Sequence, residues 1–597
     1  MATNISANQL LNSYSLFNAT DIKQFLIDQL NANPENPFKD VDYLGSNINA
    51  FIDIIAVMLQ QIQFSYSLNT SEASFSNAML YESMSKIVSL LNYKTVGKQT
   101  SMLPVNISID ASQSSNATSN GKIIIPKFLT INYNKPYVLL EEQQASIFGG
   151  KGSYDTVFYQ GSVHESQIFE AAGDDFETIN IPDPYINNGG TSFISDNFFT
   201  VYVDENNDGR WKEYSESACL FLENALSEKY ERRFTEDFGY EFKFGNGTYG
   251  KKLKKGARIV IYYLVSDGET AEMPSNSLIP NAITVYKSSL YNSIRQSNDI
   301  EYQNYDLSWF SARNTGPTTA ISYPESVASI RKNAPKVFAS QNRLYSLNDY
   351  TTFISKNFSN YCKHIYTCKN DEYISDYLKY YYDLGLTAPQ EDSRASLAQV
   401  EFMTSTHFNN IYSFIVPTTN TIIDSKVPNY LNTALKKQIV NKCSSLMGPT
   451  HNLVIMDPIH RAFCFGSPSI YNEKYNKYQV NNRIFLIRKK NSQFEHSYIK
   501  NYTVAALNAY FSSLQLGSTI SCMDINGILN SIPGTSGFYI QDVFNNKDSR
   551  LYLYVWNPLY QFEDNKLISQ SYICKNFEYP YFYDINNLEN IINVIDA

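Results

Sequence analysis

The N-terminal part of the chain follows a helical period, with apolar residues recurring every three or four positions. Asp21 can cap a first short helix, which Pro34 and Pro37 then interrupt. Ser46 precedes a longer and more apolar helix, and a third helical segment covers roughly residues 73–91. We therefore predict an N-terminal helical region, able to form a bundle, over residues 1–100.

The helix that begins after Ser46 carries an apolar stripe about five turns long. A stripe of this length needs a partner surface, which is either the core of this chain or a bundle with other chains. Pro34 and Pro37 favour the bundle, because they should hold the preceding segment apart from the helix. The stripe consists of Ile48, Phe51, Ile52, Ile55, Met58, Leu59, Ile62 and Tyr66.

From about residue 103 the apolar period changes from that of a helix to that of a strand. Residues 198–214 are typical of a hairpin that turns at 206–209. Residues 240–268 indicate two or more strands joined by glycine-rich turns. We predict a β-rich domain over residues 101–310.

Strands and helices alternate in the rest of the chain. Residues 311–326 have the Gly, Pro, Ser and Thr content of a linker, and we place a domain boundary there. This alternation predicts two small α+β domains, residues 311–465 and 466–597, and a multidomain α+β fold overall. The expected strands are residues 362–370, 396–406, 450–466 and 550–562, and the expected helices are 427–446, 498–514 and 523–532.

Residues 325–358 form a distinctive pair of short helices. Ser326 can cap the first, and Pro335 should end it, because proline cannot donate the next helical hydrogen bond. An extended link over residues 336–347 should follow. Asn348 then stands as the N-cap of the second helix, whose apolar side includes Tyr350 and Phe358.

Composition argues against several functions. The chain has 597 residues, a formal net charge of −10 and a pI near 5.3, which disfavours nucleic acid binding through a basic field. Abundant Tyr (47) and Phe (36) suit broad contact surfaces, or else reflect an AT-rich genome. The seven cysteines form no CxxC pair and fit free thiols in a reducing compartment. We expect no signal peptide and no membrane span.

A glycine-rich motif resembles a phosphate-binding loop. Gly245, Gly247 and Gly250 with Lys251 spell GxGxxGK. A phosphate loop needs a helix directly after it, and here a strand-forming run follows over residues 258–264. We therefore expect a strand–turn–strand rather than a nucleotide site.

Two further sets of residues could in principle carry chemistry. Asp204 to Gly209 match the first half of an EF-hand loop, but Ser215 stands where the bidentate Glu is required. Cys362 and His364 could share one face of a strand, and a structural pair is favoured over a coupled nucleophile. We predict no catalytic residue, no metal ligand and no cofactor.

Several blocks resemble the baseplate J-like proteins of contractile phage tails, specifically the inner-ring baseplate wedge protein of myoviruses. The blocks lie at residues 21–63, 85–109, 122–128, 244–268 and 325–358, and the match is looser at 429–459. The C-terminal stretch 572–597 and an Asn-rich insert at 472–482 depart from the family pattern. The residues that carry the resemblance are Gly45, Pro126, Gly245, Gly247, Gly250, Pro335, Arg343, Asp349 and Tyr350.

The resemblance implies a structural role in the tail baseplate of a virion, assembled in the cytoplasm of a host bacterium. Its partners would be itself, as a dimer within a wedge and a ring between wedges, other wedge subunits, and nearby tail hub or tube proteins. The N-terminal helices would join a bundle with other wedge subunits.

Family members pair through the C-terminal half. Two surfaces here could supply that contact: the face with Tyr430, Leu431, Leu435 and Val440, or the aromatic strand Leu551 to Tyr560. Two other functional classes stay open. One is a phage tail adhesin that binds host surface glycans, and the other is a cell-wall hydrolase, which would need paired carboxylates in a cleft.

Overall fold

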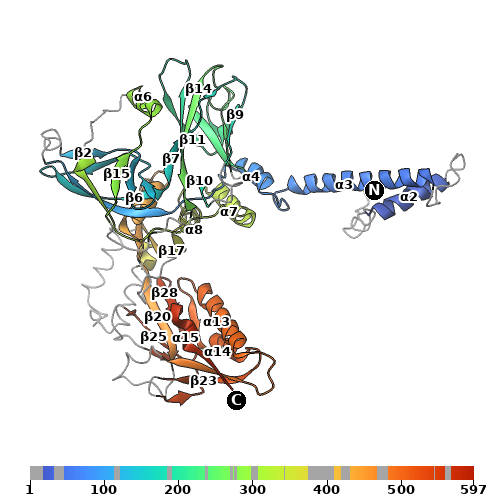
Figure 1. Ribbon diagram of the computed structural model, residues 1–597, viewed down its shortest axis with the longest axis vertical. Coiled ribbons are helices and arrows are strands. Elements are labelled where there is room, and N and C mark those ends of the chain that lie inside the picture. Colours follow the sequence, from blue (N-terminus) through green and yellow to red (C-terminus); the bar gives the residue numbers. More distant parts are fainter. Residues whose placement is uncertain are drawn as a thin grey trace. The chain divides into compact units, whose positions relative to one another are not determined.

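The chain folds into two compact units, one helical in its described residues and one with many strands, and this mixture of helices and sheets confirms the predicted α+β fold class (Figure 1). One unit comprises Met1–Thr95 with Ser326–Pro335, and the other comprises Val96–Glu325 with Lys336–Ala597. The computed structural model describes residues 18–32, 46–112, 121–183, 191–235, 239–268, 273, 279–297, 307–341, 343–373, 409–418, 430–466, 482–542, 545–558 and 566–596.

The N-terminal unit is helical, with α2 (Ala19–Ala32), α3 (Asn47–Glu72) and α4 (Tyr81–Ser89). Ser46 is the N-cap of α3, as predicted, and its hydroxyl accepts a hydrogen bond from the Ile48 amide. The third helical segment is shorter than expected, because the chain turns after α3. The Glu72 carboxylate accepts hydrogen bonds from the amides of Met79 and Leu80, at 2.9 and 3.1 Å, and these bonds lower the pKa of Glu72.

Helix α7 (Val327–Ser340) contradicts the predicted stop at Pro335, which lies inside the helix. The extended link expected from residue 336 is therefore wrong in its first part. Ile330 and Ala334, on the turns before the proline, are fully buried. Arg331 donates to the carbonyls of Phe75 and Ala78 within the N-terminal unit. These contacts hold a helix that proline alone would interrupt.

Two sheets with mostly antiparallel pairing form the β-rich part of the second unit, which was predicted over residues 101–310. The first has the order β15-β3-β4-β6-β1-β16, and a ribbon of β2 (Lys122–Ile125) and β5 (Gln143–Ser146) shares its core. Its strands are β1 (Met102–Asp110), β3 (Leu129–Asn132), β4 (Pro136–Val138), β6 (Lys151–Gln160), β15 (Ala282–Val285) and β16 (Phe310–Asn314).

The second sheet has the order β7-β14-β10-β11-β12-β13-β9, and β8 (Phe169–Glu170) also pairs with β14. Helix α6 (Ser289–Ser297) contributes Tyr291 and Ile294 to the aromatic core beside this sheet. The other strands are β7 (Ser162–Glu165), β9 (Thr178–Ile181), β10 (Phe193–Asp204), β11 (Lys212–Ser217), β12 (Lys229–Phe234), β13 (Tyr240–Lys243) and β14 (Arg258–Ser266).

Strand β16 occupies the start of the stretch that reads as a linker. It pairs antiparallel with β1, with Val105 opposite Asn314. Beyond it, β17 (Cys362–Lys369), β18 (Asn410–Pro417) and β19 (Asn452–Met456) form a three-stranded sheet. Helices α8 (Leu347–Asn357) and α11 (Thr433–Ser444) pack on this sheet in one core. The strand expected at residues 396–406 lies outside the described residues.

The N-cap of α8 is Ser346, so the predicted cap at Asn348 is wrong by two positions. The Ser346 hydroxyl accepts from the Asp349 amide, and the Asp349 carboxylate accepts from the Ser346 amide at 2.8 Å. This reciprocal pair satisfies two amides that the first turn of a helix leaves free.

In the described residues of the C-terminal part there are two four-stranded sheets and three α-helices, with α13 and α14 along one flank (Figure 1). The sheets have the orders β26-β25-β20-β28 and β24-β23-β21-β29, and β22 pairs with β27. The strands are β20 (Ile459–Gly466), β21 (Arg483–Arg488), β22 (Thr519–Ser521), β23 (Thr535–Gln541), β24 (Lys547–Asp548), β25 (Tyr552–Trp556), β26 (Lys566–Ile568), β27 (Ser571–Ile573), β28 (Glu578–Phe582) and β29 (Ile592–Asp596), and the helices are α13 (His496–Ser513), α14 (Cys522–Asn530) and α15 (Leu588–Ile591).

Candidate assembly surface on the N-terminal helices

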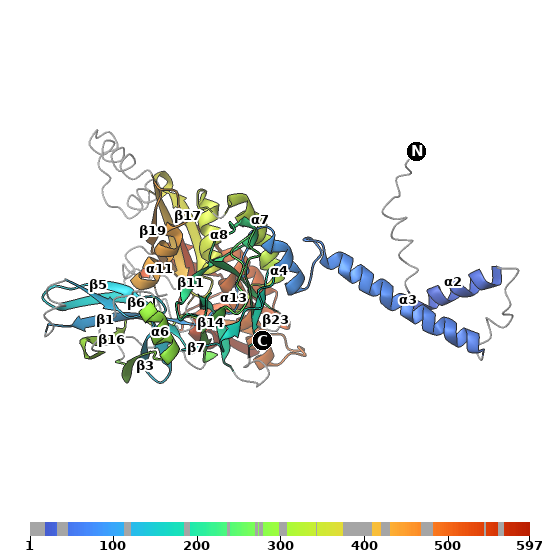
Figure 2. The same cartoon turned by 90° about the horizontal axis from the view of Figure 1, so that it is seen from above.

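Helices α2 and α3 form an antiparallel pair, seen along the N-terminal part of α3 in both Figure 1 and Figure 2. Ile27 and Ile52 are buried between them, and Leu26, Leu30 and Ile48 pack around these two side chains. An ion pair of 2.7 Å joins Lys23 to Asp53. The expectation that the prolines after α2 keep it apart from α3 is therefore wrong.

Helix α2 covers only a small part of the apolar stripe on α3. Ile52 is 4% exposed, whereas Phe51 is 65% and Tyr66 is 73% exposed. The structure thus brings the stripe together on one helix but leaves most of it without a partner among the described residues. Its other exposed members are Ile55, Met58, Leu59 and Ile62.

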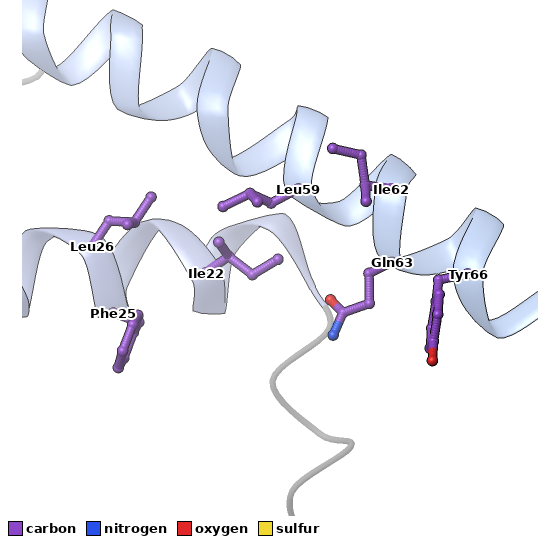
Figure 3. A pocket seen from close by; sticks show the side chains of 7 residues that line it. All are labelled: Ile22, Phe25, Leu26, Leu59, Ile62, Gln63 and Tyr66. Carbon is purple, nitrogen blue, oxygen red and sulfur yellow. The ribbon is translucent and has the colours of Figure 1, made fainter.

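An open groove of about 520 Å³ runs between the two helices (Figure 3). Figure 3 shows Phe25 and Tyr66 toward its two ends and Gln63 between them. Among the described residues that line the groove, Gln63 carries an amide side chain, and the mainly apolar lining consists of Ile22, Phe25, Leu26, Leu59, Ile62 and Tyr66. The groove extends the exposed stripe of α3 onto α2, so the two helices present one continuous apolar surface.

A second apolar face on α3 escaped the sequence analysis. At about 100° of rotation per residue, Val57, Phe64 and Leu68 lie on the side of α3 away from the first stripe. All three are exposed, Phe64 at 69%. Their spacing of seven and four residues was a readable signal, hidden by the stronger first stripe. Helix α3 therefore has two separate faces to cover.

Length and composition would also allow α3 to cross a membrane, and it is the one helix in the described residues that meets this test. Its polar residues argue for protein partners instead. Gln60, Gln61 and Gln63 lie in the middle of the helix, and Asp53 lies nearly two turns from its start. Amides and a carboxylate at such depths would lose water without gaining hydrogen-bond partners from lipid.

The glycine-rich motif forms the turn between β13 and β14, which confirms the predicted strand–turn–strand. Gly247 and Gly250 have φ angles of 86° and 74°, a region that favours glycine. A side chain on Gly245 would overlap the backbone of Gly250. Lys251 pairs with Glu205 and with Glu228, so its ammonium is held by neighbouring carboxylates.

The acidic turn after β10 is also structural. Asp204 accepts hydrogen bonds from the amides of Asp208 and Gly209 and pairs with Arg258. The strand bearing Cys362 and His364 shifts its register between them. Burial raises the pKa of Cys362 and lowers that of His364 to about 4, which favours the neutral form of each rather than a thiolate–imidazolium pair.

The remaining residues of the resemblance have structural positions. Pro126 directly follows β2, Arg343 is exposed, and Asp349 belongs to the cap of α8. Tyr350 is fully buried, and its hydroxyl is 2.9 Å from Nδ1 of His451. Gly45 lies outside the described residues.

No protein-family model matches the chain, and no curated protein matches it. Among solved structures, it is similar to a chain in the cryo-EM structure of the anti-feeding prophage (AFP) baseplate, 6-fold symmetrised. The match covers 94% of this chain and 98% of that chain, with 10% sequence identity and a TM-score of 0.26. A TM-score of this size is too low to establish a shared fold.

Proposed function

We propose that the chain is a structural component of a phage tail baseplate wedge. In this role it associates with itself and with other wedge subunits to form the ring around the tail hub. The observation that carries the proposal is the exposed apolar surface of α2 and α3, which is too large for a helix pair that stands alone. The sequence blocks that resemble wedge proteins support the same conclusion.

The two apolar faces of α3 require at least two further partner surfaces. Burying a large apolar side chain is worth about 1.5 kcal/mol or more, so each face could contribute several kcal/mol to assembly. Because the faces point in different directions, a single additional helix cannot cover both. A bundle with helices of other subunits satisfies this geometry.

The wider role follows the same proposal. The chain would pair within a wedge, close a ring between wedges and lie near hub or tube proteins, in virion tails assembled in the host cytoplasm. We propose no catalytic activity. A tail adhesin that binds host glycans is the alternative, and the alternating strands and helices of the C-terminal part, unlike a β-rich fibre, favour the wedge.

Phe51→Asp tests the proposal. Ile52→Asp is the matched control, because Ile52 is the neighbouring residue but is buried between α2 and α3. Phe51 is mostly exposed, so the isolated variant should fold and keep the wild-type circular dichroism and elution volume. In an assembled bundle the new carboxylate would be buried without a partner, at a cost of several kcal/mol. Complementation of tail assembly in cells that lack the wild-type gene should therefore yield no complete tails. Ile52→Asp should instead loosen the α2–α3 pair in the isolated chain.

Normal tails containing Phe51→Asp, seen by electron microscopy, would contradict the proposal. Flotation of the wild-type chain with lipid vesicles supplies the membrane control. If wild-type chain floats and Phe51→Asp does not, α3 is a membrane helix and the bundle is wrong.

A further inference from the structure

Two parts of the second unit meet at a short joint. The middle module is the chain from α8 to β19, and the C-terminal module is the chain from β20 to β29. Strand β19 ends at Met456 and β20 begins at Ile459, so Asp457 and Pro458 connect the two modules. The Lys436 ammonium on α11 pairs with the Asp457 carboxylate at 2.6 Å, which ties this connection to the middle module.

Aromatic rings pair across the joint. Phe414 on β18 stacks on Phe577, which precedes β28, with ring centroids 5.7 Å apart and an interplanar angle of 29°. Both rings are buried, in a cluster that also contains Cys368. Because these rings remove apolar surface from water, they favour the closed joint, in which the two modules touch.

Two histidines lie in the same joint. His460 on β20 stacks on Tyr430 of the middle module, with centroids 4.8 Å apart and an interplanar angle of 5°. Tyr430, which the sequence placed in a possible contact with a second copy, thus packs on its own chain. The ring of Tyr579 on β28 lies 5.9 Å from His364 on β17 and 6.2 Å from His460. Each histidine therefore contacts a tyrosine of the other module.

Neither imidazole has surroundings that would support a positive charge. Both ring nitrogens of His460 and Nε2 of His364 are buried without a hydrogen-bond partner in the described part of the chain. The rings packed against His460 are those of Tyr430, Tyr579 and Tyr581. Burial raises the pKa of all three phenols, so they stay neutral and supply no negative charge.

The closed joint consequently resists protonation. Burial lowers the pKa of His460 and of His364 to about 4, and the neighbouring Lys363 charge adds to this effect at His364. Cation–π attraction between an imidazolium and Tyr430 would offset only part of the hydration that burial removes.

Opening the joint would remove this resistance. Water can then hydrate both imidazole rings, and their pKa values return toward the ordinary value of about 6.5. Between pH 6.5 and 4 the open joint therefore binds protons that the closed joint excludes. A decrease from pH 7 to pH 5 favours opening by up to about 20-fold for each histidine.

We infer that the joint between the middle and C-terminal modules is an acid-sensitive hinge. When His364 and His460 bind protons, the aromatic contacts across the joint separate, and the C-terminal module moves as a folded body on the link formed by Asp457 and Pro458. The two modules have separate hydrophobic cores, so each can stay folded on its side of the open joint. Acid therefore opens the joint before it unfolds either module.

Hydroxyl-radical footprinting of the full chain, read by mass spectrometry, tests the hinge. Phe414 and Phe577 report the opening of the joint, whereas Ile439 and Leu507, fully buried in the two cores, report unfolding. From pH 7 to pH 4.5, oxidation of the two phenylalanines should rise at least several-fold, and oxidation of the two core residues should not change. No rise at the phenylalanines, or an equal rise at all four residues, would overturn the inference.

Replacing both histidines separates their protonation from other effects of acid. The double variant His364→Phe with His460→Phe keeps a ring at each position but binds no proton, so its joint should stay closed at pH 4.5. Acid opening of this variant as in the wild type would overturn the inference. If the double variant does not fold at pH 7, each single variant should open at lower pH than the wild type, and unchanged midpoints in both would count as the same failure.

Asp457→Asn is the matched control. It removes the ion pair with Lys436 at every pH but leaves both histidines in place, so its joint should still open in acid. Loss of the acid response in this variant would assign the response to the ion pair and overturn the role of the histidines.

Discussion

At the residue scale, His460 is a histidine buried among aromatic side chains. It is fully buried on β20, and neither ring nitrogen has a hydrogen-bond partner in the described part of the chain. The ring stacks on Tyr430 and meets Tyr579 and Tyr581 edge-on. Burial lowers the pKa of His460 to about 4, because an imidazolium would lose its hydration among aromatic rings.

This burial predicts acid sensitivity. Between pH 6.5 and 4 the unfolded chain binds a proton at this histidine and the folded chain does not, so stability falls as the pH decreases through that window. The loss between pH 7 and pH 5 should be about 2 kcal/mol. His460→Phe should remove that part of the pH dependence, measured as urea midpoints at the two pH values. An unchanged pH dependence in the variant would contradict the prediction.

The orphan state of His460 could not be predicted from the sequence. A histidine in a strand has many possible partners, and only the three-dimensional packing of Tyr430 and β28 shows that no polar group of the described residues reaches it. The register shift between Cys362 and His364 could not be predicted either, because the apolar alternation of a strand does not show where its pairing with a neighbour slips.

At the element scale, the proline in α7 makes the clearest prediction. Pro335 removes one helical hydrogen bond and crowds the turn before it, yet the helix continues to Ser340. Pro335 therefore destabilises α7 locally, and the contacts around the helix compensate for this cost.

Pro335→Ala should stabilise the chain by about 1–2 kcal/mol. The restored helical amide contributes up to about 3 kcal/mol, and the greater freedom of the unfolded chain offsets about 1 kcal/mol of it. A higher thermal midpoint by calorimetry would support this account. A lower midpoint would show that the proline is needed at this point for the contacts of α7.

Most elements of this fold could be predicted because their periods are strong. Helix α3, its cap at Ser46, the hairpin after β10 and the alternation beyond residue 360 all follow from local patterns. The errors lie where packing or side-chain geometry outweighs a local rule. Pro335 stays in a helix because its neighbours are buried, and Ser346 replaces Asn348 as a cap because Asp349 completes the reciprocal pair.

Only part of the candidate assembly surface could be predicted from the sequence. Sequence spacing identified the stripe from Ile48 to Tyr66, but it could not show that α2 folds back to bury Ile52 and shape a groove. It also passed over the second face with Phe64. Whether an apolar helix face is covered depends on chain segments distant in sequence, and periodicity carries no information about them.

At the scale of the whole molecule, the C-terminal stretch is part of the fold rather than an addition to it. Strand β28 pairs in parallel with β20, and β29 pairs in parallel with β21. Strands from residues 572–597 form one edge of each of the two four-stranded C-terminal sheets. Two sheets that begin more than 100 residues earlier thus depend on the last strands of the sequence.

Ile592→Asp tests this dependence. Ile592 is fully buried in the C-terminal core and lies opposite Ile484, so a carboxylate there should destabilise the C-terminal part by at least about 4 kcal/mol. Limited proteolysis should then cut between residues 459 and 596 at concentrations of protease that leave wild type intact. Asn593→Asp, the next residue on the same strand and only partly buried, should resist as wild type does. Because α2 and α3 belong to a different compact unit from the C-terminal sheets, hydrogen exchange in these two helices should not change in either variant. Wild-type resistance of Ile592→Asp would mean that the last strand is a dispensable appendage and that the two sheets are complete without it.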